Sequence, residues 1–369
     1  MKKNLIISTL VLAAMCSCTK NDALLPENPQ KEISFNAPVV SNITKAVTGE
    51  IIEYDTEESF GVFSVYHEDG FSGWEDNASP YINGAEFSYD DSAKDGDSYV
   101  DKSGGWTGGY LFPKVGSLSF AAYSPFDAHS SASTVPAGKG NFSYGNTGLA
   151  IDDFSVPASP ADQYDLMYSN RLYNRTVNMG SQTGYEGMDI TFFHALSSIR
   201  FTAQLDSPYT STFTLTSVTI NGVEYSGDFC ENVLNPKTAS YKSEPYWIVD
   251  YTDTGDKATT SYTAFNGEYV MTQTQTQVNA YDIILMPQEF IFKNENGEVV
   301  GYSDAEIVIE YTVNESTQSS TVKLSDLKIK EWEMGKRYTY NITLGYDLIL
   351  VGATVEKWED GNTDDIPIN

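Results

Sequence analysis

The sequence predicts an all-β protein made of two tandem antiparallel β-sandwich domains. Short runs of alternating apolar and polar residues lie between clusters of Gly, Asn, Asp and Ser, with a spacing of about 8 to 12 residues. The 25 tyrosines and 18 phenylalanines supply large side chains for strands and their cores. No segment keeps a helical period over a useful length, so any helices should be short.

The N-terminal half is predicted to begin with a strand at residues 32–39. Ile33, Phe35, Ala37 and Val39 recur there at every second position, which puts them on one face of a strand. Further strands are expected at residues 60–66 and 117–125, with loop-rich stretches at 67–109 and 126–164.

The C-terminal half shows a cleaner strand pattern after a Gly-rich stretch that ends at Gly187. A boundary near Tyr185 divides the chain into domains at 32–184 and 185–369. Asn221-Gly222 is typical of a two-residue hairpin turn, and a second hairpin is expected around residues 314–317. The strands expected in this half cover residues 189–203, 212–220, 280–286, 306–313, 319–324, 337–344 and 348–358.

The first residues have the layout of an export signal. Lys2 and Lys3 precede an apolar run from Leu5 to Met15, which is shorter than the about 20 apolar residues that cross a bilayer. The run closes on Cys16-Ser17-Cys18, and a cysteine at the cut is similar to a bacterial lipoprotein signal. Residues 1–17 are then a signal peptide, Cys18 carries the lipid, and residues 18–31 form a tether. The alternative is an ordinary secretory signal with two incidental cysteines.

The charge of the chain excludes several classes of partner. Loss of residues 1–17 removes Lys2 and Lys3, so the net charge changes from −29 to −31. Nucleic acid and anionic membrane surfaces both require a basic face, so neither is an expected partner. Besides Cys16 and Cys18 there is a single cysteine, Cys230, so stability must come from burial and not from disulfides.

The sequence offers no set of residues for catalysis, so we expect no enzyme, no cofactor and no metal site. His194 is interpreted as a half-buried strand residue bonded to the backbone. The acids between Asp90 and Asp101 supply oxygen atoms that could bind calcium, but they do not fit the twelve-residue calcium loop, which favours a solvated loop. Trp74, Trp106, Tyr99 and Tyr110 could stack on sugars, although core positions are the simpler interpretation.

Eight short segments, in this order, resemble those of the fimbrillin (Mfa-like, type V pilin) lipoproteins. They are Glu32-Ile-Ser-Phe-Asn-Ala37, Phe60-Gly-Val-Phe63, Leu118–Pro125, Asp165–Tyr168, Phe193–Ile199, Leu285–Gln288, Trp332–Tyr338 and Val355–Trp358. The resemblance implies two transthyretin-like sandwiches and the role of pilus shaft subunit, tip adhesin or anchor on the outer face of the outer membrane. It also implies that a protease removes the first strand and that a strand of another subunit fills the vacated groove.

Two features of this chain bear on that scheme. Family members are commonly cut after an arginine, whereas the matching loop here carries Lys45. This leaves open a lysine-cleaving maturation, an unprocessed anchor, or a solvated loop lysine with no role in processing. The expected donor is the segment from Leu348 to Asn369, where Ile349, Val351, Ala353 and Val355 share one face and Trp358 adds an anchor.

Three functions remain open from the sequence. The first is a pilus subunit or adhesin that assembles with other subunits by strand exchange and is held in the outer membrane by its lipid. The second is a surface lipoprotein that binds glycans without polymerising. The third, a secreted hydrolase, ranks last because no nucleophile, base or metal set can be named.

Overall fold

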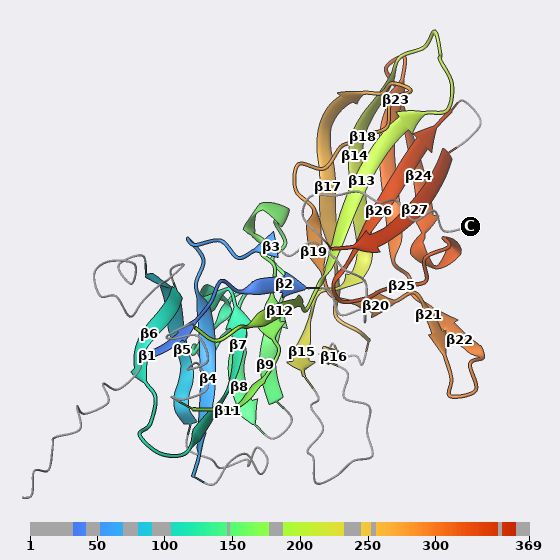
Figure 1. The fold of residues 1–369 in the computed structure, drawn as a ribbon. Coiled ribbons are helices and arrows are strands. Elements are labelled where there is room, and N and C mark those ends of the chain that lie inside the picture. The colour runs from blue at the N-terminus through green and yellow to red at the C-terminus, as the bar shows by residue number, and fades with distance from the viewer. Residues whose placement is uncertain are drawn as a thin grey trace, which may run out of the picture.

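The computed structural model describes residues 32–41, 52–68, 80–90, 105–145, 148–176, 187–231, 245–251, 256–345 and 349–358. In this part of the chain the predicted all-β fold is confirmed. The helical elements that the structure describes are single 3-10 turns of three residues each: η2 (Phe126–Ala128), η3 (Pro160–Asp162) and η4 (Leu324–Asp326). Figure 1 shows the strands in two blocks: the blue to green strands with the yellow β15 (Ser226–Cys230) form the N-terminal block, and the remaining yellow to red strands form most of the C-terminal block.

One large sheet dominates the N-terminal block, and its strands run in the order β1-β6-β5-β4-β7-β10-β12-β2-β3, with β11 attached to β7. The strands of this sheet are β1 (Glu32–Phe35), β2 (Val39–Ser41), β3 (Ile52–Glu53), β4 (Phe60–His67), β5 (Pro80–Asp90), β6 (Gly105–Leu111), β7 (Ser117–Ser124), β10 (Met167–Ser169), β11 (Leu172–Arg175) and β12 (Thr191–His194).

The first described segment closes this sheet. β1 pairs with β6 at one end of the strand order, and β2, only three residues later, pairs with β12 near the other end. The sheet therefore curls until its two ends meet at residues 36–38, and it encloses an aromatic core. The fully or nearly fully buried members of this core include Ile33, Phe35, Phe60, Phe87, Trp106, Phe120 and Phe192.

A second sheet covers the outer side of β4 and β7. Its strands are β8 (Asn141–Gly145), β9 (Gly148–Ser155), β15 (Ser226–Cys230) and β16 (Tyr246–Val249), in the order β16-β15-β9-β8. Phe63 of β4 and Tyr123 of β7 point into a different core from Phe60 and Phe120 of the same strands. β4 and β7 are therefore covered on both faces, which explains why every residue of the two strands except Tyr66 is buried.

The C-terminal block is a sandwich of two main sheets. One has the order β18-β13-β26-β27, with β19 also on β13, and the other has the order β17-β14-β23-β24. The strands are β13 (Ser197–Leu205), β14 (Phe213–Glu224), β17 (Thr259–Val270), β18 (Thr276–Gln277), β19 (Ile283–Leu285), β23 (Glu306–Val313), β24 (Ser316–Lys323), β26 (Lys336–Leu344) and β27 (Ile349–Lys357), with the small pairs β20 (Gln288–Glu289) with β25 (Glu331–Trp332) and β21 (Ile291–Lys293) with β22 (Val299–Tyr302).

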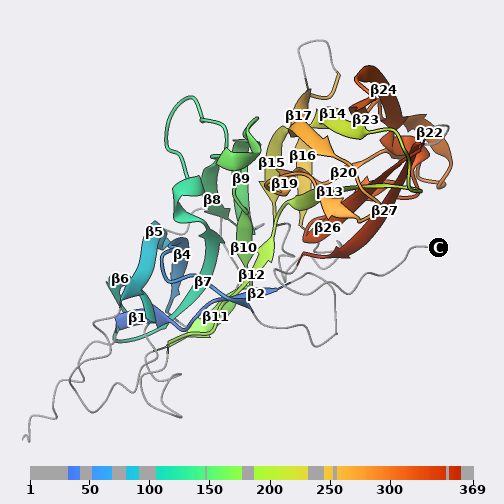
Figure 2. The ribbon, with the colours of Figure 1, turned by 90° about the horizontal axis from the view of Figure 1, so that it is seen from above.

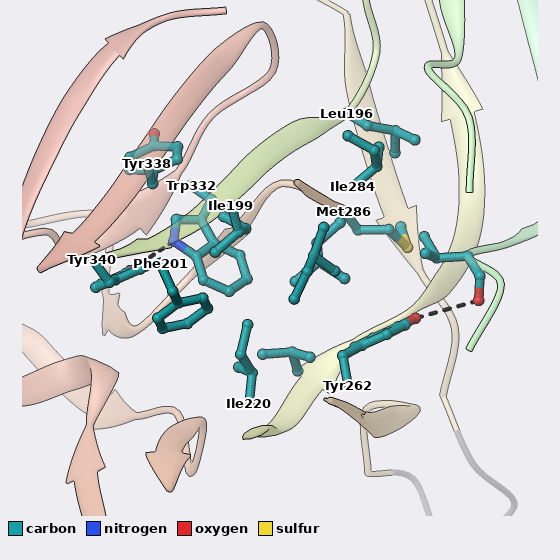
Figure 3. Close-up of a cluster of buried hydrophobic side chains, with 14 of the residues drawn as sticks. Leu196, Ile199, Phe201, Ile220, Tyr262, Ile284, Met286, Trp332, Tyr338 and Tyr340 are labelled. Carbon is teal, nitrogen blue, oxygen red and sulfur yellow. Dashed lines mark hydrogen bonds between the residues drawn. The ribbon is translucent and has the colours of Figure 1, made fainter. Parts of the chain in front are cut away.

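Aromatic side chains fill the space between these sheets, as Figure 3 shows. The Trp332 indole donates a hydrogen bond to the Tyr340 hydroxyl at 2.9 Å, which satisfies both buried polar groups. The Tyr262 hydroxyl donates to the Val156 carbonyl oxygen at 3.3 Å and so ties β17 to the segment after β9.

The strand pairing departs from the prediction in two places where it is parallel: β2 with β12, and β13 with β26 over eight residue pairs. Asn221-Gly222 does not form a hairpin turn; β14 runs through it with an irregular register, and Gly222 has a φ of +69°. The second hairpin is confirmed: Asn314 and Glu315, with φ of 46° and 70°, join β23 to β24 in the two-residue form that favours such angles.

The predicted strand at 189–203 is divided into two. β12 pairs with β10 and β2 of the N-terminal block, whereas β13 pairs with β19 and β26 of the C-terminal block. β15 then returns to pair with β9. We therefore propose that the change between the two blocks lies near Ala195-Leu196, with strands β15 and β16 completing the N-terminal block, as a refinement of the expected 184/185 boundary.

Candidate functional site

The two ends of the described chain form the candidate site, because both are edge elements. β1 lies at the end of the large sheet, and its inward side chains Ile33 and Phe35 are fully buried. The Phe35 ring meets the rings of Phe60, Phe87 and Phe120 edge-on at centroid distances of 5.6, 5.4 and 5.9 Å. Edge-on contacts of this kind add to the stabilisation from burial, so Phe35 is the central apolar anchor of the first segment.

Backbone hydrogen bonds fasten the same segment to the residues before β12. The Asn36 N–H donates to the Met188 carbonyl at 2.9 Å, and the Met188 N–H donates to the Ser34 carbonyl at 2.9 Å. The Val39 N–H donates to Ile190 at 3.0 Å. Gly187 lies so close that a Cβ atom there would sit 2.6 Å from the Asn36 nitrogen. The first segment is therefore held between β6 on one side and residues 187–193 on the other.

The expected single strand at 32–39 is interrupted, so its four apolar residues do not share one face. Ala37 is exposed and Val39 is half-buried, whereas Pro38 is buried and Val40 packs against the core. Pro38 has no N–H for a ladder, and the chain changes its neighbour from β6 to β12 across residues 36–38. Odd-numbered residues therefore face the core before the break, at Ile33 and Phe35, and the even-numbered Val40 faces it after the break.

β27, the last strand, is the second edge element. It pairs with β26 over nine residues, and among the described strands it has no neighbour on its other side. Ile349, Val351, Ala353 and Val355 pack against the core, whereas Leu350 is 52% exposed. The predicted apolar face of this strand is thus present within the described residues.

The end of β27 meets the N-terminal block at Trp358. The Trp358 ring stacks on the His194 ring with centroids 4.3 Å apart and planes 7° apart. His194 Nδ1 lies 2.5 Å from Asp165 Oδ2, and both His194 and Trp358 are buried. The role expected for His194 is corrected in two respects: the side chain is buried and not half-buried, and its partners are a side-chain carboxylate and an indole.

Backbone hydrogen bonds connect four segments around Trp358 that lie far apart in the sequence. The Ala195 N–H donates to Leu166, the Gly335 N–H donates to Leu196, and the Trp358 N–H donates to Gly335, at 2.8, 2.9 and 3.1 Å. These residues belong to four of the eight segments that carry the family resemblance. Their shared task is to join the N-terminal block, β13 and the end of the last strand.

A cavity of about 260 Å³ lies beside this joint. Its walls include Val40 from β2, Tyr54 from the segment before β4, and His194 and Trp358. Asp55, Glu58 and Asp165 also line it. Burial raises the pKa of the Glu58 carboxyl, and the nearby carboxylates of Asp55 and Asp127 raise it further. The cavity is therefore acidic and aromatic, and it lies where the first and last segments meet.

Several sequence predictions fall on residues outside the described ranges: the lipidation site Cys18, the possible cleavage site Lys45, the acids from Asp91 to Asp101, and Trp74 and Tyr99. Trp106 is a core residue that is 1% exposed, and its indole donates to the Glu58 carbonyl at 3.2 Å, so it cannot stack on a sugar. Tyr110 stacks on Phe87 at 6.2 Å.

Groups of three or more His, Cys, Asp or Glu side chains that could hold a metal ion do not occur in the described part of the chain. Within the same ranges, no helix has the length and apolar character needed to cross a membrane.

Comparison with known proteins assigns the family. The model of the fimbrillin-like family matches residues 44–358. The chain belongs to this family. No curated protein matches the chain.

A solved structure shares the fold of this fimbrillin-like chain. It is similar to a fimbrial protein from Bacteroides vulgatus, with 17% identity and a TM-score of 0.52, covering 89% of this chain and 100% of the other. A candidate cell adhesion protein from Bacteroides uniformis has 15% identity and a TM-score of 0.46, covering 89% and 99% of the two chains. One from Bacteroides ovatus has 15% identity and a TM-score of 0.47, covering 90% and 99%.

Proposed function

We propose that this fimbrillin-like chain is a structural or adhesive subunit of a cell-surface pilus, which assembles by strand exchange. Membership of the fimbrillin-like family supports a pilus or adhesin role. The observation that carries the mechanism is that residues 32–41 form the strand at one end of the curled sheet and the second strand from its other end. Their removal would leave two strand edges and an apolar groove, which an extended strand from another molecule can fill.

The last strand has the pattern of a replacement for the first. Ile349 and Val351 have the same two-residue spacing as Ile33 and Phe35, and both pack inward in their own sheet. Among the described strands β27 pairs with β26 alone, so it can leave by breaking that ladder. We therefore propose that Ile349 and Val351 of one subunit enter the positions of Ile33 and Phe35 in the next.

Removal of the first segment from purified protein should produce a ladder of oligomers. Cleavage after Lys45 by a lysine-specific protease frees residues 32–45, and strand-exchanged polymers resist heating in detergent. We expect the ladder on a gel only after cleavage. A Lys45→Gln variant treated with the same protease is the matched control and should stay monomeric. A cleaved chain that loses residues 32–45 and remains monomeric would contradict the mechanism.

We further propose that Cys18 is acylated and anchors the subunit at the outer membrane with its body facing outward. Several acyl chains on one cysteine hold a protein on a bilayer stably, whereas a single chain binds only marginally. Cys18→Ala should therefore move the protein from the membrane fraction to the soluble fraction, as measured by fractionation and immunoblotting. Cys16→Ala is the matched control and should keep its membrane association. Membrane association of Cys18→Ala at the original level would contradict the lipid anchor.

A glycan-binding surface lipoprotein is the second candidate, and the cavity near Trp358 favours it. Aromatic rings beside carboxylates are groups that can stack on a sugar and bond its hydroxyls, and Tyr54, Tyr164 and Asp165 line this cavity. Retention of a strictly monomeric protein on a polysaccharide column, lost on Tyr164→Ala, would support this function over the pilus subunit.

A further inference from the structure

We propose that the buried contact between Trp358 and His194 couples the first segment to the last strand. The end of β27 is then protected from local opening only while residues 32–41 are in place. The inference rests on the proposed strand exchange and adds an order of events to it. A chain that still carries its first segment keeps its own C-terminal strand, and loss of that segment loosens the strand that is to be donated.

The first step is that the two segments meet at one cavity, although more than 300 residues separate them. Val40 of β2 and Trp358, the residue after β27, line the same space of about 260 Å³ together with His194. Figures 1 and 2 both place β2 beside β12 at the junction between the two blocks. A change at β2 therefore reaches the surroundings of Trp358 directly.

The second step is that β12 carries the contact. His194 is the last residue of β12, and its ring is the surface on which the Trp358 ring stacks. β12 has β10 on one side and β2 on the other, with Thr191 opposite Val39 and Phe193 opposite Ser41. Without β2, β12 becomes an edge strand, and water reaches the side of the cavity that Val40 now covers.

The third step concerns the other contacts of the end of β27, which in the described residues include its pairing with β26, the bond from the Trp358 N–H to the Gly335 carbonyl and one ion pair. Its described neighbour is β26 alone, and the Glu356 carboxylate lies 3.7 Å from the guanidinium of Arg337. Trp358 is only 6% exposed, so its burial is a large share of what fixes this end. The free energy of opening a strand end depends on the contacts of that end. Water that reaches the Trp358 ring weakens its contact with His194 and therefore increases local opening of β27.

Amide hydrogen exchange on dilute monomer tests the coupling. The protein is cut within residues 42–50, the first segment is stripped off, and exchange is compared before and after at residues 353–358. We expect exchange there to accelerate about tenfold or more, while exchange in β14 stays unchanged. Trp358→Ala in the uncut chain should reproduce the acceleration. Leu350→Ala, on the exposed face of β27, is the matched control and should not.

The decisive experiment combines the Trp358→Ala substitution with removal of the first segment. If Trp358 carries the coupling, stripping the first segment from the Trp358→Ala variant should cause little further acceleration, because the two changes remove the same contact. Fully additive effects, or unchanged exchange at 353–358 after stripping, would overturn the proposal. Oligomers that form without faster exchange would overturn the coupling and leave strand exchange intact. Faster exchange without oligomers would support the coupling and contradict strand exchange.

Discussion

A chain that begins at Ala46 is expected to lose most of its free energy of unfolding. The deletion removes Ile33 and Phe35, each fully buried, and each contributes about 1.5 to 3 kcal/mol. It also removes the pairing with β6 and β12 and exposes both edges. The combined loss is comparable with the whole stability of a domain, about 5 to 15 kcal/mol.

Denaturant unfolding of the two chains measures this loss. The shortened chain should unfold at far lower urea concentration or aggregate, whereas a chain that begins at Lys31 serves as the control and should match the full protein. If the chain from Ala46 is a stable monomer with an unchanged urea midpoint, the first segment does not stabilise the N-terminal sheet, which would contradict strand exchange.

Phe35→Ala should be the most damaging single substitution in the first segment. The ring is fully buried among Phe60, Phe87 and Phe120, and truncation of a buried Phe to Ala costs about 3 to 5 kcal/mol. Val300→Ala, which truncates a side chain that is 64% exposed, is the control and should change the free energy of unfolding little. Equal urea midpoints for Phe35→Ala and the unchanged protein would show that the Phe35 site is not a packed part of the core.

The alternation of apolar residues predicted most strands well, since burial of one face is a local property of the sequence. The segments around Phe60, Leu118, Val308 and Tyr340 all became strands. Alternation does not reveal which strand is the neighbour, and for this reason the parallel pairing of β13 with β26 was missed.

The breaks in two predicted strands depend on distant contacts. The first segment is interrupted at Asn36–Pro38 because the curled sheet brings β6 and β12 to the same place. The other break follows His194, where the Ala195 N–H bonds to Leu166 and the Trp247 indole bonds to the Ala195 carbonyl at 2.7 Å. Pro38 was the only local sign of either break.

The joint at Trp358 was only partly visible in the sequence. His194 and Trp358 both lay in segments that resemble the family, yet nothing in their spacing indicated that they stack. Asn221-Gly222 shows the opposite error: a strong local turn signal was absorbed as an irregularity within β14, because β17 and β23 pair with that strand on both sides.

Binding of the C-terminal segment to the vacated groove tests the central claim most directly. A peptide of residues 348–369 is titrated into the chain that begins at Ala46, and affinity and thermal stability are measured together. We expect saturable binding that raises the melting temperature, lost on Val351→Asp in the peptide, whose side chain faces the core, and kept on Leu350→Asp, whose side chain faces solvent. Absence of binding, or equal loss with both variants, would contradict assembly by exchange of this strand.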